Sequence, residues 1–495
     1  MVKKIMALKP TIGLEIHAEL KTRSKMFCSC LNDPGERRPN LNICPVCMGH
    51  PGTLPVINKE AVRKVVKTGL ALKCRIPEKS KFDRKNYFYP DLPKGYQISQ
   101  YDLPLCQNGF LDIEGKKIRV RRVHLEEDTG RLLHSEKDKS SLVDFNRAGV
   151  PLMELVTEPD IKSAKEAKSF SQELQLILRY LGVSEADMEK GQLRVEANVS
   201  LSDDSEKLGT KVEVKNLNSF RSVERAIDFE IARQKEILEK KGKVLQETRG
   251  WNEPKQETIS QRLKEEANDY RYFPEPDLPS LNTPSKYVQE LCEEIGELPQ
   301  QRRKRFLEEY GLTENEVESF VVNKDLGEYY EKSVSELRNW VKEADERKEV
   351  NKEEFLKLAK IASNYILSDL LGLIKAASVV GEDFLITPEN FGEFITLVYK
   401  EIISSKTAKE ILKEMFATGK DPSHILKKRE LSQITDKGEI DKAAKEVLAS
   451  NAKVVEDFKK GKRNALQFLV GQVMAKTKGR ANPSLAREAL EKNIF

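Results

Sequence analysis

The sequence predicts an α+β fold followed by helical domains, and two observations carry that prediction. Up to about residue 280, short stretches of alternating apolar and polar residues are interrupted by Pro, Gly and Asn turns, which is typical of strands mixed with helices. From about residue 285 onward, apolar residues recur with the period of a helix. With 495 residues, the chain is long enough for two to four domains.

The first strand is expected over residues 11–20, where apolar residues occupy every second position and leave Glu15 and His17 together on the polar face. Residues 192–201 alternate in the same way and place Glu196 on the polar face. Residues 211–215 alternate around Glu213. Several strands are therefore expected to present carboxylates on one hydrophilic face.

Two segments, 163–181 and 219–240, have helical periodicity and are expected to back this sheet. A proline-rich stretch at 273–279 should stop regular structure, because proline fixes φ and removes a backbone donor. A domain boundary is expected just after it, followed by two helical domains.

Charge and composition exclude some of the classes to which the protein could belong. The net charge of +5 is too small to indicate a nucleic-acid binder by itself, but residues 401–495 hold 20 Lys and Arg against 13 Asp and Glu. The most apolar stretch, 365–380, is interrupted by Asp369 and Lys375, so no membrane segment is expected. We see no secretory leader, and we expect a reducing, cytoplasmic location.

Four of the seven cysteines form two close pairs, Cys28 with Cys30 and Cys44 with Cys47. Four thiolates satisfy a tetrahedral Zn²⁺ and leave no open position, so we expect a structural zinc site in the segment near 28–47. The alternative is four reduced, buried thiols, because the first pair has one intervening residue where zinc ribbons have two.

Acidic residues form the second motif. They comprise Glu15 beside His17, the run HLEED at 124–128 that contains Glu126, and the single residues Glu154, Glu196 and Glu213. Each alone could be a solvated surface residue. If they converge, their mutual repulsion calls for a divalent cation, and oxygen ligands indicate Mg²⁺.

The third motif is the run at 82–100, which places three tyrosines, among them Tyr89, and the spaced lysines Lys85 and Lys94 in turn-rich sequence. This composition suits a loop that grips phosphate, or equally an ordered surface loop whose aromatic residues fill a minor core. Neither the dinucleotide fingerprint nor the P-loop motif is present, so any nucleotide must bind in another way.

These motifs, taken with longer strings, resemble the B-subunit family of aspartyl/glutamyl-tRNA amidotransferases, the GatB/GatE family. The strings span nearly the whole chain: TIGLEIHAEL at 11–20, HLEEDTG at 124–130, DFNRAGVPLMELVTEPD at 144–160, KVEVKNLNSF at 211–220, ETRGW at 247–251, DYRYFPEPDL at 269–278, ISSKTA at 403–408 and FLVGQVMAKTKGRANP at 468–483.

The resemblance implies a cradle domain of antiparallel sheet and helices at 1–293, an all-helical domain at 294–405, and a small helical tail domain at 406–495 that contacts tRNA. It also implies the chemistry. ATP and Mg²⁺ would phosphorylate the side-chain carboxylate of Glu-tRNA(Gln) or Asp-tRNA(Asn), and ammonia would then amidate the acyl phosphate.

The resemblance further implies residue roles. It assigns catalysis to Glu15, His17, Lys85, Lys94, Glu126, Glu154, Glu196 and Glu213. Within that set, Glu15, His17, Glu126, Glu196 and Glu213 would hold Mg²⁺, with Glu196 standing where relatives are expected to carry Asp. Lys85, Lys94 and Tyr89 would bind the nucleotide. The tail residues expected at tRNA are Lys462, Arg463, Lys476, Lys478 and Arg480.

The resemblance also implies partners, because the chain shows no amidase signature that could release ammonia. A glutaminase, the A subunit, would supply ammonia through a tunnel, and a small C subunit would complete a heterotrimer. The rival interpretation is a non-catalytic tRNA-binding scaffold. The related GatE type is disfavoured, because too few residues lie between Pro279 and the helix expected at 339–341 to hold its inserted domain. The preference between Asp-tRNA and Glu-tRNA is left open.

Overall fold

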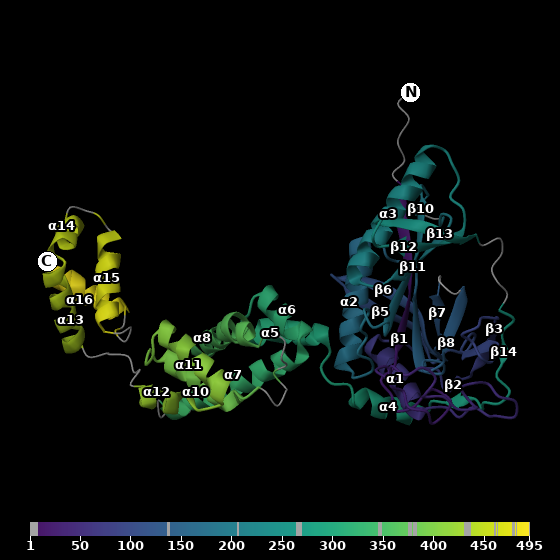
Figure 1. Ribbon diagram of the computed structural model, residues 1–495, viewed down its shortest axis with the longest axis horizontal. Coiled ribbons are helices and arrows are strands. Elements are labelled where there is room, and N and C mark those ends of the chain that lie inside the picture. The colour runs from purple at the N-terminus through teal and green to yellow at the C-terminus, as the bar shows by residue number, and fades with distance from the viewer. Residues whose placement is uncertain are drawn as a thin grey trace. The chain divides into compact units, whose positions relative to one another are not determined.

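The computed structural model describes residues 8–135, 139–204, 207–263, 270–344, 349–374, 379, 384–429, 437–459, 462, 464–477, 481 and 483–494. The chain forms two compact units, Met1–Pro299 and Gln300–Phe495. The first combines sheets and helices and the second is helical, as the colours of Figure 1 show along the chain. The expected α+β class followed by helical structure is therefore confirmed.

The described part of the first unit is built on an eight-stranded sheet. In their order across the sheet, the strands are β13 (Glu257–Leu263), β12 (Glu247–Asn252), β11 (Val212–Leu217), β10 (Leu193–Ser202), β1 (Lys9–Glu19), β9 (Pro151–Thr157), β6 (Lys116–Glu127) and β5 (Cys106–Ile113). Neighbours are antiparallel, apart from the parallel pair of β11 and β12. β1, the first strand in sequence, lies in the middle with β10 and β9 on its two sides.

One face of this sheet is covered by helices. α1 (Lys59–Ala71), α2 (Ala164–Tyr180) and α3 (Phe220–Glu239) share a single apolar core with the strands, and α4 (Ser285–Glu293) packs on α1. Ile12, Leu14 and Ile16 of β1 lie in that core, whereas the residues between them are only half-buried. The alternation therefore leaves the opposite face of the sheet polar and uncovered by these helices, as the sequence pattern predicts.

Three small sheets complete the described part of the first unit. The run at 82–100 forms the hairpin of β3 (Asp83–Asn86) and β4 (Tyr96–Ser99), which β14 (Phe273–Pro274) joins at its edge. β2 (Lys79–Ser80) pairs with β15 (Leu281–Asn282), and β7 (Arg131–Ser135) pairs with β8 (Ser140–Asp144). The proline-rich stretch thus contributes one short edge strand, where proline needs no ladder hydrogen bond.

The second unit contains helices that begin with α5 (Pro299–Tyr310). They continue with α6 (Glu314–Val322), α7 (Lys324–Ala344), α8 (Lys352–Asn364), the π-helix η1 (Tyr365–Leu370), α9 (Leu371–Leu373), α10 (Pro388–Tyr399), α11 (Ser405–Thr418), α12 (Pro422–Arg429), α13 (Lys437–Ser450), α14 (Ala452–Lys459), α15 (Asn464–Lys476) and α16 (Pro483–Ile494). No helix within the described ranges is long and apolar enough to cross a membrane.

The packing within this unit groups the helices. α11 and α12 contact α10, whereas α13, α15 and α16 contribute to one apolar core that includes Leu469 and Leu490. The predicted division into domains at 294–405 and 406–495 stays a prediction.

Candidate active site

The polar face of the large sheet carries acids and histidines from five neighbouring strands. The register sets Glu196 of β10 opposite Glu15 of β1, and Glu154 of β9 opposite His17 of β1. Glu154 is also opposite His124 of β6. Because side chains alternate along each strand, these residues share one face. We call the whole group the acid cluster: Glu15, His17, His124, Glu126, Glu154, Glu196 and Glu213.

The inner half of the acid cluster centres on Glu154. His17 Nε2 lies 3.4 Å from Glu154 Oε2 and 3.7 Å from Glu126 Oε1. His124 Nε2 lies 3.4 Å from the same Glu154 oxygen and 3.7 Å from Glu126 Oε2. The Glu126 side chain is only 1% exposed, and the hydroxyl of Ser99 donates to it at 3.0 Å. Two buried carboxylates are thus held between two imidazoles.

The outer half of the cluster is formed by Glu15, Glu196 and Glu213, which offer ligand atoms within 4.8 Å of one another. Lys215 Nζ lies 2.8 Å from Glu196 Oε2 and 3.7 Å from Glu213 Oε1. Thr248 donates its hydroxyl proton to Glu213 at 2.7 Å. The acids of the outer half are therefore partly neutralised by one lysine.

The cluster contains three groups with the geometry of a metal site. Besides the outer group, Glu15, His17 and Glu154 form one, and His124, Glu126 and Glu154 form another, each with ligand atoms within 4.8 Å of one another. Magnesium binds oxygen ligands at about 2.1 Å, which brings them about 3 to 4.2 Å apart. Small side-chain movements would close each group around such an ion, so the residues fit Mg²⁺.

Burial and proximity shape the charges of the cluster. Burial, reinforced by Glu154, raises the pKa of Glu15 to about 7. Burial would lower the pKa of His17, but the carboxylates of Glu154 and Glu126 outweigh it and raise that pKa to about 9. Burial opposes ionisation of Glu154, yet both histidines hold its pKa well below the usual value. When no metal is bound, the histidines thus serve as counter-charges for the acids. A divalent cation would take over that role and displace the proton from any imidazole nitrogen that it binds.

Lys85 of β3 adjoins the inner half of the cluster. Burial works against its ammonium, but Glu126 and Glu154 outweigh that effect and raise the pKa of Lys85 above its usual value. Its Nζ lies 5.1 Å from the ring centroid of Tyr270 and 5.9 Å from that of Tyr87. Tyr89, whose ring is edge-on to Tyr87, is 57% exposed. A charged lysine therefore borders the acids, and the exposed ring of Tyr89 lies next to Tyr87, one of that lysine's aromatic neighbours.

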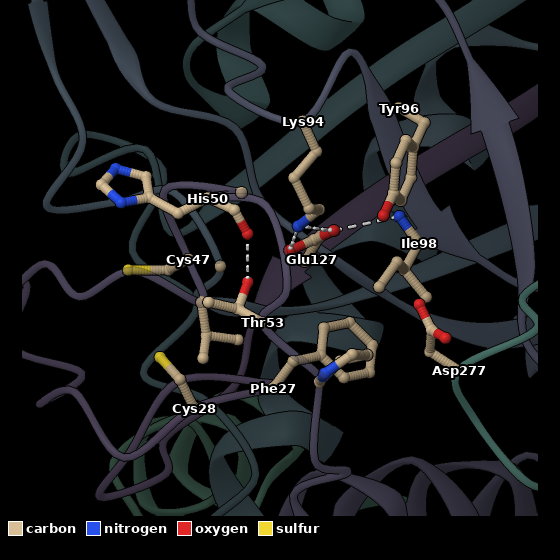
Figure 2. A pocket seen from close by; sticks show the side chains of 14 residues that line it. Phe27, Cys28, Cys47, His50, Thr53, Lys94, Tyr96, Ile98, Glu127 and Asp277 are labelled. Atoms are coloured by element: carbon tan, nitrogen blue, oxygen red, sulfur yellow. Dashed lines mark hydrogen bonds and ion pairs between the residues drawn. The ribbon is translucent and has the colours of Figure 1, made fainter.

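Lys94 lies in a different place from Lys85. Its ammonium forms an ion pair at 2.6 Å with Glu127, whose side chain alternates with that of Glu126 and points away from the acid cluster. The pair lines a small pocket together with Cys28 and Cys47 (Figure 2). Gly49 has φ +68° and lies under the Lys94 stem, where an added Cβ would come within 2.5 Å of Cγ. The structure does not bring Lys94 to the acids, and its role with phosphate stays a prediction.

The four cysteines of the segment near 28–47 converge as their spacing indicates. Ligand atoms of Cys28, Cys30, Cys44 and Cys47 lie within 4.8 Å of one another, and none forms a disulfide. A hydrogen bond between the Cys28 and Cys47 sulfurs is the main cause that lowers the pKa of Cys47 to about 5. Four thiol groups at this separation fit a tetrahedral zinc ion.

Three basic neighbours of the acids, within the described residues, were not among the predicted site residues. They are His124, Lys215 and Arg122, whose Nη2 lies 3.7 Å from Glu154 Oε1. The sequence pattern could have indicated His124 and Lys215. Each stands two residues from a predicted acid on an alternating strand and so shares its face. Arg122 belongs to the same face as His124, but only the register of β6 with β9 shows that it reaches Glu154.

The tail residues are only partly described. Lys462 forms an ion pair with Asp457 at 3.1 Å, and Lys476 forms one with Glu446. Arg463, Lys478 and Arg480 lie outside the described residues. Contact of these five residues with tRNA stays a prediction.

Known proteins are similar to this chain over nearly its whole length. Residues 10–289 match the family described as the GatB/GatE catalytic domain, and residues 348–494 match the GatB domain. The aspartyl/glutamyl-tRNA(Asn/Gln) amidotransferase B subunit of Caldicellulosiruptor saccharolyticus is 47% identical over 99% of both chains. The proteins of the same name from Thermotoga maritima and Persephonella marina are 47% and 46% identical over 98% of this chain and 99% of theirs. This chain therefore belongs to the family of B subunits of aspartyl/glutamyl-tRNA(Asn/Gln) amidotransferases.

Proposed function

We propose that this chain uses ATP to phosphorylate the side-chain carboxylate of Glu-tRNA(Gln), Asp-tRNA(Asn) or both, and then amidates it with ammonia. The observation that supports this most is the meeting of acids and histidines from β11, β10, β1, β9 and β6 beside the charged Lys85. A scaffold that only holds tRNA has no use for so many buried carboxylates on one face. Burying them without a cation is costly.

In this proposal the acid cluster holds magnesium. Glu15, His17, Glu126, Glu196 and Glu213 are the predicted ligands, and the geometry adds Glu154 and His124. When bound, Mg²⁺ would neutralise the oxygens of the nucleotide and of the substrate carboxylate. Arg122, beside Glu154, and Lys215, between Glu196 and Glu213, keep the acids in place from either side.

Lys85 would stabilise the transferring phosphoryl group. Its raised pKa keeps Lys85 protonated at neutral pH. Negative charge on the phosphoryl oxygens strengthens their attraction to the Lys85 ammonium. The exposed ring of Tyr89 would stack on the nucleotide base. An oxygen of the substrate's side-chain carboxylate attacks the γ-phosphorus of ATP, and the bond between that phosphorus and ADP breaks. Ammonia then attacks the acyl carbon and inorganic phosphate leaves with the proton that ammonia sheds.

The ammonia would come from another member of a larger assembly. The relatives are named as B subunits, so each works together with other chains. We propose that a glutaminase, the A subunit, and a small C subunit complete a heterotrimer with this chain in the cytoplasm. The chain alone should then show little glutamine-dependent amidation.

The cysteine group would hold a structural Zn²⁺. Its four ligands fill a tetrahedral site, and its loop connects to the sheet through the backbone bond from Met26 N to Gly149 O, close to the start of β9. Zinc would thus fix the loop on the strand that carries Glu154.

The basic tail would contact tRNA phosphates through Lys462, Arg463, Lys476, Lys478 and Arg480. Loss of two such contacts in Lys462→Ala with Lys476→Ala should weaken tRNA binding and make it less dependent on salt. An unchanged affinity at fixed ionic strength would contradict the assignment.

The decisive experiment supplies ammonium, ATP, Mg²⁺ and misacylated tRNA to the reconstituted complex. Glu126→Gln and Lys85→Ala should abolish formation of ADP and of the acyl phosphate, while binding of tRNA persists. Glu257→Gln, which changes a partly exposed glutamate of β13, is the matched control. If Glu126→Gln and Lys85→Ala phosphorylate at the wild-type rate, the scaffold interpretation is correct.

A further inference from the structure

Lys25 is a fully buried lysine that stands beside the four cysteines. Its exposure is 0%, and its backbone N–H donates to the carbonyl of Cys30 at 2.9 Å. At the other end of the side chain, Nζ lies 3.8 Å from Cys47 Sγ and donates to the carbonyl of Phe145 at 3.2 Å. The lysine therefore runs along the cysteine loop with its ammonium directed at sulfur.

No carboxylate in the described ranges lies within 4.0 Å of the Lys25 ammonium. Glu127 and Lys25 both approach Gly149, but Glu127 is paired with Lys94 at 2.6 Å. An isolated ammonium is expensive to bury, so it needs a negative partner. The sulfur atoms of the cysteine group are the negative partner within reach.

The charge of a zinc centre supplies that partner. Zn²⁺ with four thiolates has a net charge of −2, which is also unfavourable in a buried site. A hydrogen bond from an ammonium to a thiolate is charge-assisted on both sides. Lys25 and the zinc-bound sulfurs would therefore neutralise part of each other's charge and so lower the cost of burying both.

We infer that Lys25 is the counter-ion of the zinc tetrathiolate and a determinant of its zinc affinity, acting through Cys47. This role rests on the proposed structural zinc site. Lys25 is a positioning residue, because it touches the ligand sulfur and not the metal. Through Phe145 O, it also links the zinc loop to the segment that leads into β9.

The test is zinc affinity of the full chain, measured by competition with a chromogenic chelator. Lys25→Met keeps the volume and removes the charge. Lys25→Gln keeps a donor for the Phe145 carbonyl and removes the charge. Both should bind zinc about 10- to 100-fold more weakly, the range found when a partner of a metal ligand is lost. Lys25→Arg, which keeps the charge, should lose less, and Lys64→Met on α1 should leave the affinity unaltered.

Thermal unfolding separates this role from packing. Zinc binding releases the protons of the thiols, so Lys25 faces a centre of charge −2 in the zinc-loaded protein and a less negative group of cysteines in the zinc-free protein. Lys25→Met should therefore lower the melting temperature more in the zinc-loaded protein than in the zinc-free protein. Equal losses in both forms, or zinc affinity within twofold of wild type for Lys25→Gln, would overturn the inference. A wild-type chain that retains no zinc would instead overturn the zinc site itself.

Discussion

The acid cluster and the cysteine group are both candidate metal centres, yet they are assembled in opposite ways. The cysteines belong to one loop in which Cys28 and Cys47 are nineteen positions apart in the sequence, and local turns bring them together. The acids come from five strands between residues 15 and 213, and only strand pairing brings them together. A site on a sheet therefore depends on strand register, whereas a site in a loop depends on the spacing of its residues along the chain.

The two centres also differ in how they are neutralised. Lys25 contacts the cysteine group at Cys47, and the group has no open position once its four sulfurs bind a metal ion. The acid cluster is half-open, with Glu15 30% exposed and bordered by Lys85, Lys215 and Arg122. A closed site is suited to holding a loop, and an open site is suited to admitting substrate.

The largest effect is expected from Glu154→Gln in the reconstituted complex. Glu154 belongs to two of the candidate metal groups and contacts both histidines, so its loss removes a ligand and a shared counter-charge. Ammonium-dependent amidation should fall by more than about 100-fold, which exceeds the usual loss for an outer partner of a metal ligand. A rate within tenfold of wild type would show that the inner half of the cluster is not the reaction centre.

A smaller and different effect is expected from Cys44→Ser. Losing one of four ligands should release zinc and, if zinc stands near 100 times its dissociation constant, lower the free energy of unfolding by about 3 kcal/mol. Amide hydrogen exchange should rise around residues 28–47, while the protein that stays folded keeps phosphorylating its substrate. Abolished phosphorylation in fully folded protein would contradict the structural role assigned to zinc.

The smallest effect is expected from Lys215→Met. Lys215 neutralises Glu196 and Glu213 in the outer half of the cluster, so its removal should strengthen the repulsion between these acids. The Mg²⁺ concentration that gives half-maximal amidation should change by a few-fold, whereas Lys207→Met, in the loop before β11, should leave it unaltered. An unchanged magnesium dependence would assign Lys215 to folding alone.

The sequence determined a large part of the architecture because its patterns are local. The alternation of β1 and β10 predicts strands with one polar face, and the burial of Ile12, Leu14 and Ile16 matches it. The paired cysteines likewise predict their own convergence, because two close pairs joined by a short loop match the ligand spacing of a structural zinc site.

Which acids meet, and which lysine joins them, depends on how the chain folds in three dimensions. No local pattern sets Glu15 opposite Glu196, His17 opposite Glu154, or Lys94 beside Glu127. The first two pairings follow from strand order and register, and a shift by one residue would turn those side chains to the other face. Lys94 lies in the turn between β3 and β4, so its position depends on how that turn packs. Lys25 shows the same limit, since nothing in its neighbours along the chain indicates that it is buried against Cys47.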